Sequence, residues 1–184
     1  MLHAPFFSEE THGTTPARVW AQLEALHKDG RARAIGVSNF SVSHLEKLLK
    51  TAKIVPAVNQ IELHPYLYDR ELQAYTQRQR ILLSAYGPLA PIVRFSGGPL
   101  DAVLERVATR CGKSREVVLL RWGIQKGWAV ITTSSKVQRL KDMGQQEGWA
   151  LTADEVDEIE RVGGQWKRRA FWNDEYAALE TSRL

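Results

Sequence analysis

Apolar and polar positions alternate along the chain in a pattern that predicts short buried strands, each followed by a helix. Short apolar runs with β-branched residues are typical of buried parallel strands. They lie at residues 32–37, 57–63, 81–86 and 128–131. The segments around them carry apolar residues at helical spacing. We therefore expect helices at residues 16–28, 43–52, 69–80, 100–111, 115–126, 137–146 and 153–162. This alternation predicts an α/β fold with a parallel sheet and right-handed crossovers.

Helix-capping residues support several of these boundaries. Thr15 before Pro16 is a helix start, because proline is tolerated at the first helical position. Thr152 and Glu155 have the spacing of a capping box. Residues 90–99 are rich in proline and glycine and are expected to form a flexible loop. Residues 1–7 are expected to contain the end of a further strand, stopped by a proline.

Composition limits the class of protein. The chain has 184 residues, of which 43% are hydrophobic and 25% charged, as expected for one globular domain. The net charge of +4 is modest, and the basic residues are not interleaved with aromatics, so nucleic-acid binding ranks last. A single cysteine, Cys111, excludes an intrachain disulfide, and we expect its thiol to be buried and inert. No apolar run has the length of a membrane span or signal peptide, so we expect a cytoplasmic protein.

Polar residues stand where two of the predicted strands should be buried or end. Ser38 and Asn39 follow the first strand, and Gln60 lies within the second. Ligands bind at the carboxyl ends of strands in α/β folds, because the loops there gather polar groups. Asn39 capping the next helix is an equally simple alternative. Asn59 and Glu62 must likewise bond to each other, to the backbone or to a ligand, because burying them unpaired is costly.

Other candidate residues also have structural alternatives. His3 precedes Pro5 near the start of the chain, and Tyr86 ends the third strand, where it could be a core aromatic residue. Ser134 and Arg139 lie around the start of a helix, which is an anion site by geometry and dipole but also an ordinary capped terminus. His64 has no second ligand at metal-site spacing, so no metal site is predicted.

Three segments together resemble successive signatures of the aldo-keto reductase family. They are Gly36-Val37-Ser38-Asn39-Phe40, Asn59-Gln60-Ile61-Glu62-Leu63-His64-Pro65-Tyr66 and Ala85-Tyr86-Gly87-Pro88-Leu89. The family commonly has serine where Gly87 stands. The resemblance implies the C-terminal half of a (β/α)8 TIM barrel: a strand stub, four βα units and a C-terminal tail. Residues 1–184 would then be one domain, truncated at the N-terminus, with Met1 an internal methionine.

The resemblance also implies roles for individual residues. Ser38, Asn39 and Gln60 would hold the nicotinamide carboxamide of NADPH, and Tyr86 would stack on the nicotinamide ring. Ser134 and Arg139 would bind the adenosine 2′-phosphate, and His3 would lie beside the substrate carbonyl. Thr133 and Met143 replace the lysine and asparagine usual in the phosphate site. NADPH is therefore the expected cofactor, with NADH as the alternative.

The implied activity is reduction of a small aldehyde or ketone to an alcohol. The family's proton donor is a tyrosine tuned by a lysine and an aspartate, and none of Tyr66, Tyr68, Tyr75 and Tyr86 stands in that motif. We therefore expect little or no turnover from the chain alone. The alternative is a non-enzymatic module that binds NADP(H) or docks on a partner. A half barrel would leave sheet edges open, which are sites of aggregation or pairing.

Overall fold

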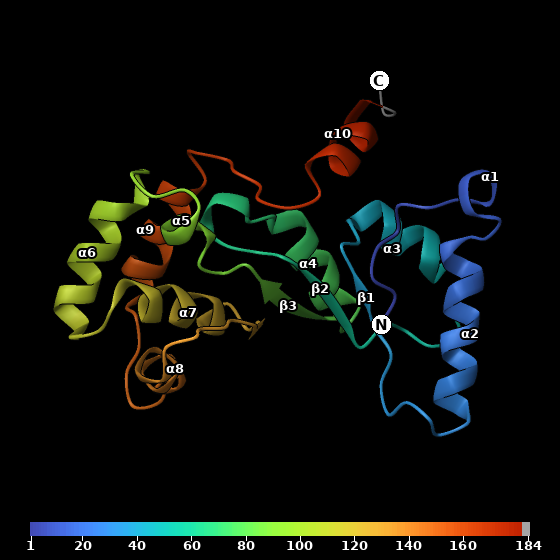
Figure 1. Cartoon of the computed structure of the whole chain (residues 1–184), viewed down its shortest axis with the longest axis horizontal. Helices are drawn as coiled ribbons and strands as arrows, with labels where there is room; N and C mark the ends of the chain where they lie inside the picture. Colours follow the sequence, from blue (N-terminus) through green and yellow to red (C-terminus); the bar gives the residue numbers. More distant parts are fainter. Residues whose placement is uncertain (182–184) are drawn as a thin grey trace. The chain divides into compact units, whose positions relative to one another are not determined.

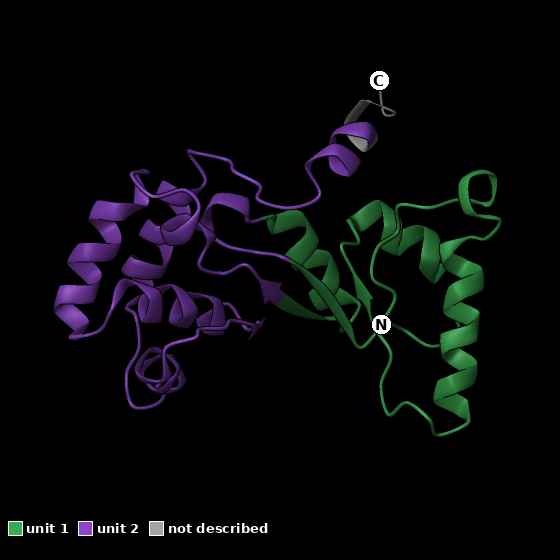
Figure 2. Ribbon diagram, in the orientation of Figure 1, with its two compact units in different colours: residues 1–61, 69–84 green, residues 62–68, 85–184 purple. Residues whose placement is uncertain are grey.

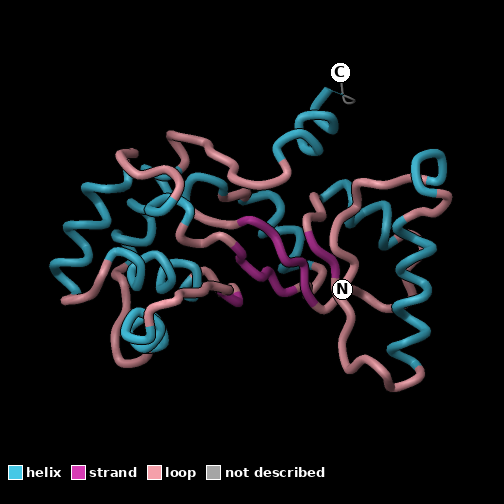
Figure 3. The backbone as a smooth tube through the Cα atoms, in the orientation of Figure 1, coloured by secondary structure: helices cyan, strands magenta, loops and turns pink. Residues whose placement is uncertain are grey.

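The computed structural model describes residues 1–181 and divides into two compact units (Figure 2). Unit 1 comprises residues 1–61 and 69–84, and unit 2 comprises residues 62–68 and the chain from Ala85 onward. The hydrogen-bonded strand order is β1-β2-β3-β4, and β2 and β3 each have residues in both units. The chain therefore has the α/β organisation that the sequence predicts, drawn by element type in Figure 3.

Unit 1 carries a parallel strand pair with helices (Figure 1). Its elements in chain order are α1 (Glu9–His12), α2 (Pro16–Lys28), β1 (Val37–Ser38), α3 (Val42–Leu49), most of β2 (Val58–Glu62), α4 (Arg70–Arg78) and the start of β3 (Leu82–Tyr86). Strand β1 pairs with β2 in parallel, with Val37 opposite Asn59 and Ser38 opposite Gln60. Leu2 forms an isolated parallel bridge to Val37, in agreement with the strand end predicted within residues 1–7.

Unit 2 is mainly helical. Its elements are the 3₁₀ helix η1 (Pro65–Leu67), α5 (Ala90–Val93), α6 (Leu100–Cys111), α7 (Arg115–Gln125), β4 (Ala129–Val130), α8 (Val137–Gly144), α9 (Ala153–Gly163) and α10 (Asn173–Thr181), together with the ends of β2 and β3. Helix α6 packs on α7 and α9, and α9 packs on η1. No helix within residues 1–181 is long and apolar enough to cross a membrane.

The first predicted strand is shorter than the apolar run suggests. Residues 32–37 were expected to form it, but only Val37 and Ser38 are in ladder geometry. The start of the run is held by the preceding helix instead, because the amide of Ala32 donates to the oxygen of Leu26 and its carbonyl bonds His27. The end of the run pairs with neighbouring segments, since the oxygens of Ile35 and Gly36 accept the amides of Ala57 and Leu2, so only its start is lost to α2.

Most predicted helices are confirmed, with ends that differ by a few residues. The loop expected at residues 90–99 is partly wrong, since it contains α5, whose proline lies in the first turn where its missing N–H costs nothing. The sequence pattern also missed α1, η1 and α10. Residues 182–184 of the predicted tail lie outside the described residues.

The core of unit 1 contains a carboxylate, that of Glu24, as well as the aromatic side chain of Trp20. Trp20 is buried on α2, and its Nε1–H donates to the backbone oxygen of Ile54. One turn further, the Glu24 carboxylate is 5% exposed and accepts the amides of Lys53 and Ile54 at 2.7 and 2.9 Å. Although burial raises the pKa of Glu24, these amides lower it below the ordinary value. Glu24 thereby fixes α2 to the turn that leads into β2.

Aromatic packing and a partly buried ion pair organise the core of unit 2. Trp122 and Trp128 meet edge to face at 5.0 Å, and Tyr68 packs against both. Lys126 Nζ lies over the Tyr68 ring and 2.6 Å from the Glu160 carboxylate. Cys111, expected to be buried, is half-buried, and burial raises the pKa of its thiol.

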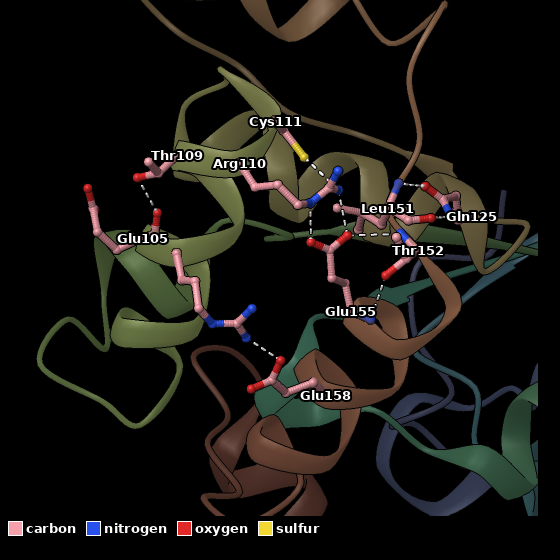
Figure 4. A network of polar contacts seen from close by, with 10 residues as sticks. Glu105, Thr109, Arg110, Cys111, Gln125, Leu151, Thr152, Glu155 and Glu158 are labelled. Carbon is pink, nitrogen blue, oxygen red and sulfur yellow. Dashed lines mark hydrogen bonds and ion pairs between the residues drawn. The ribbon is translucent and has the colours of Figure 1, made fainter.

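Another buried carboxylate, Glu155, lies in the first turn of α9. Figure 4 shows Arg110 reaching it from α6, while the Thr152 amide donates to Glu155 Oε2 at 2.9 Å. The Glu155 amide donates to the Thr152 hydroxyl in return, which completes the predicted capping box. Burial raises the pKa of Glu155, but the bonds from Arg110 and Thr152 outweigh it and lower the pKa below the ordinary value of 4.5.

This lowered pKa gives unit 2 a stability that depends on pH. Because the folded-state pKa lies below the unfolded value, Glu155 stabilises the fold above about pH 4.5, and the contribution is lost as the pH falls through the folded pKa. We expect the melting temperature to fall between pH 6 and pH 3, and to fall less steeply in Glu155→Gln. Thermal unfolding followed by circular dichroism measures both slopes. Glu9→Gln is the control, since Glu9 forms an exposed pair with Arg18, and equal slopes for the two variants would contradict the assignment.

Candidate functional site

Four of the predicted site residues meet in unit 1 at the end of β1. The Ser38 hydroxyl donates to the backbone oxygen of Gln60 at 2.6 Å, and the Asn39 amide N–H donates to the same oxygen at 2.9 Å. The Asn39 side chain donates from Nδ2 to the backbone oxygen of His3 at 3.0 Å and to Ser38 Oγ at 3.2 Å. Strand pairing and side-chain bonds therefore place His3, Ser38, Asn39 and Gln60 in one cluster.

The backbone of this cluster is strained at Asn39. Its φ of 62° lies in the left-handed region, which is uncommon for a residue other than glycine and is tolerated best by asparagine. Asn39 is 1% exposed, so it is not a surface turn. Such strain persists only where surrounding contacts determine the conformation, and it concentrates at functional sites.

Asn59 supplies part of that support. Its side chain accepts the amide of Phe40 at Oδ1, 3.3 Å away, and donates from Nδ2 to the Phe40 carbonyl at 2.8 Å. Both residues are buried. Of the polar residues in β2, Asn59 thus serves the backbone, while Gln60 is half-buried beside Ser38 and Asn39. This resolves for Asn59 the choice that the sequence leaves open.

His3 is exposed at this cluster, whereas its backbone is fixed by Asn39. Ser38 and Asn39 are buried, and their side chains already donate to the backbone oxygens of Gln60 and His3 and to Ser38 Oγ. Gln60, half-buried beside them, carries a primary amide, which both donates and accepts hydrogen bonds as a ligand amide requires.

Tyr86 ends β3 in unit 2 and is half-buried. Its ring meets that of Phe171 at 5.6 Å with the planes 72° apart. Burial, helped by the Glu62 carboxylate, raises the pKa of Tyr86 well above the ordinary tyrosine value. Its hydroxyl accordingly stays protonated at neutral pH.

Ser134 and Arg139 flank the start of α8, also in unit 2. Ser134 Oγ accepts the amide of Lys136, the residue that caps α8, at 3.1 Å, and Arg139 lies in the first turn of that helix. Arg139 and Thr133 are exposed. Met143, on the same helix, is buried against Val117 and Leu120 of α7. The residue that replaces the family's asparagine therefore packs the helix onto its neighbour.

The sequence requires a partner for a buried Glu62, and its side chain is fully buried and paired with His64 at 2.9 Å. The sequence pattern missed that Glu62 also accepts the amides of Ala170 and Phe171, at 2.7 and 3.1 Å. No local pattern shows a bond across more than a hundred residues. Among the described residues no group of three or more potential metal ligands gathers.

Comparison with known proteins defines the class: the chain matches the Aldo/keto reductase family model over residues 1–163 and belongs to this family. It is 37% identical over 183 residues to the NADPH-dependent alpha-keto amide reductase of Saccharomyces cerevisiae, covering 96% of this chain and 59% of that protein. It is 44% identical over 151 residues to the glyoxal reductase of Bacillus subtilis, covering 78% of this chain and 53% of that protein.

Solved structures agree. A Bombyx mori aldo-keto reductase in complex with NADP superposes with a TM-score of 0.81 at 28% identity, covering 94% of this chain and 60% of that one. An aldo/keto reductase from Brucella melitensis superposes with a TM-score of 0.76 at 31% identity, covering 87% of this chain and 58% of that one. The chain thus spans between half and three fifths of the length of these relatives.

Proposed function

We propose that this chain carries the cofactor site of an NADPH-dependent reductase of small aldehydes or ketones. The observation that carries the proposal is the hydrogen-bonded cluster of Ser38, Asn39, Gln60 and His3 at the end of β1. The similarity to a keto amide reductase and a glyoxal reductase supports a carbonyl substrate. The similarity to structures of whole reductases supports a sheet that is part of a (β/α)8 barrel.

The residues present fit the nicotinamide carboxamide. This group needs one acceptor and one donor, and the Gln60 amide provides both, with Ser38 Oγ and Asn39 Oδ1 as further acceptors. Asn39 is held in place by His3 and Ser38, so its orientation is set before a cofactor arrives. NADPH, when bound, supplies the hydride for carbonyl reduction. The exposed imidazole of His3 would donate a hydrogen bond to the substrate carbonyl.

The site for the adenosine 2′-phosphate would be formed by Ser134 and Arg139. An exposed guanidinium pairs with phosphate in a bidentate way, and a hydroxyl near a helix start adds a donor. The missing lysine leaves Arg139 as the main charge, so NADPH selectivity should depend on it. This dependence can be measured directly.

Arg139→Ala is expected to weaken NADPH binding by about 10-fold to 100-fold, because a hydrogen bond to a charged group contributes about 1.5–3 kcal/mol. Binding of NADH, which lacks the 2′-phosphate, should change by less than about twofold. Titration with each dinucleotide, followed by the fluorescence of the reduced nicotinamide, gives both dissociation constants. Arg106→Ala is the matched control, since Arg106 is an exposed arginine of α6 paired with Glu158. Equal losses for both dinucleotides would remove Arg139 from the phosphate site.

The proposed chemistry also needs a proton donor to the developing alkoxide. The family's tyrosine motif has no counterpart among the tyrosines of this chain, so we propose that the 184-residue chain alone binds NADPH with little or no turnover. A purified chain that reduces glyoxal within tenfold of the Bacillus subtilis relative would overturn this. A binding module without enzymatic activity is the second candidate, and persistent NADPH binding with no reduction by any form of the protein would favour it.

A further inference from the structure

The buried Glu62 carboxylate ties the C-terminal segment to the end of β2 within unit 2. Glu62 accepts the amides of Ala170 and Phe171, while His64 Nε2 bonds the same carboxylate at 2.9 Å. The side chains of Glu62 and His64 are both 0% exposed. Three donors therefore converge on one carboxylate away from water, where hydrogen bonds to a charged group are strongest.

Further contacts fix the same segment, residues 166–171. The amide of Arg168 donates to the carbonyl of Tyr66 at 3.0 Å, and the Trp166 ring packs edge-on against Tyr66. Arg94 lies over the Phe171 ring at 4.7 Å. The segment is thus held at both ends, although Lys167 and Arg168 in its middle are exposed.

The result of this tethering is the position of Phe171. Its ring meets Tyr86 edge to face at 5.6 Å, a favourable aromatic geometry. The next residue, Gly87, has a φ of +62°, and a Cβ built there would lie 3.3 Å from Phe171 Cε2. The absence of a side chain at Gly87 therefore lets Phe171 approach the Tyr86 ring closely.

We propose that Glu62 is a positioning residue, whose carboxylate holds residues 168–171 so that Phe171 fixes the Tyr86 ring for stacking on nicotinamide. The inference rests on the proposed function for the identity of the ligand. Only an acceptor-only group satisfies all three converging N–H donors, since an amide in its place would point an NH₂ at one of them. Glu62→Gln is therefore a minimal change that breaks the tether and keeps the volume.

The first test needs no cofactor. Trypsin cleaves after Lys167, Arg168 and Arg169 only when the segment opens, so the native cleavage rate reports the tether. We expect Glu62→Gln to raise this rate about tenfold, the effect of one lost hydrogen bond to a charged group. Glu24→Gln is the matched control, because Glu24 is a buried carboxylate that accepts two backbone amides in unit 1. Mass spectrometry of the first cleavage sites separates opening of residues 166–171 from global unfolding. A cleavage rate that is unchanged in Glu62→Gln overturns the tether.

The second test addresses the ring. Glu62→Gln and Phe171→Leu should each weaken NADPH binding about fivefold to tenfold and leave 2′,5′-ADP, which lacks nicotinamide, within about twofold. Phe171→Leu keeps the carboxylate and its bonds, so it succeeds even where Glu62→Gln folds poorly. Equal effects on both ligands, or no effect on either, overturn the positioning role. If the wild-type chain binds neither ligand, the proposed function and the role of the Tyr86 ring are both overturned. The trypsin cleavage rates still show whether Glu62 holds the segment.

Discussion

Gly163→Ala is expected to lower the free energy of unfolding by about 2–3 kcal/mol, although alanine is the better helix former. Gly163 is the last residue of α9 and is buried. A Cβ built there would lie 2.5 Å from Pro65 Cβ and 2.6 Å from the Pro65 carbonyl oxygen. Both are closer than real contacts, and the carbonyl is backbone, so η1 itself must move. The cost of that movement exceeds the gain in helix propensity.

Gly144→Ala is the matched control, because Gly144 is the last residue of α8 and a Cβ there meets nothing within 4 Å. We expect it to be neutral or to stabilise by about 0.5–1 kcal/mol. Urea unfolding of the two variants beside the wild type measures both signs. If both substitutions stabilise, the close approach of α9 to η1 is not required, and the interpretation of this contact is wrong.

The Gly163 contact bears on the site as well as on stability. The amide of Trp166 donates to the Gly163 carbonyl, so the tethered segment 166–171 starts from the end of α9. A shift of α9 away from η1 would move that starting point. We therefore expect Gly163→Ala also to raise trypsin cleavage after Lys167, by a route independent of Glu62.

The sequence pattern predicts most elements because burial and capping are local properties. Leu100–Cys111 forms a helix as expected, since its apolar spacing and C-terminal glycine agree with its packing. Residues 32–37 do not form the full predicted strand, because Ala32 bonds to the helix before it. The four-residue α1, capped by Ser8, is too short for apolar periodicity to reveal.

In the candidate site, too, local features were predictable and long-range contacts were not. The position of Ser38 and Asn39 was predictable, since polar residues after a short apolar strand lie at its carboxyl end. The tether between Glu62 and Phe171 was not, because it joins residues that only the fold brings together. For Asn59 the sequence showed that a buried amide needs partners, and the structure supplies them in the backbone of Phe40.

Asn39 allows the strain of the site to be separated from its chemistry. Asn39→Ala and Asn39→Gly both remove the amide that bonds His3 and Ser38, so both should weaken NADPH binding by about 10-fold to 100-fold. Their stabilities should differ, because glycine adopts a φ of 62° freely and alanine does so at a cost of about 1 kcal/mol. Dinucleotide titration and urea unfolding of the same samples give the two quantities.

Binding and stability should therefore move independently at this position. If Asn39→Gly binds NADPH as tightly as the wild type, the left-handed backbone alone is enough for binding, and the side-chain amide is dispensable. If both variants lose binding equally while only alanine loses the extra stability, the side-chain amide is required for NADPH binding. Asparagine is then the residue that meets both demands, since it tolerates the left-handed conformation better than other side chains and its amide bonds His3 and Ser38.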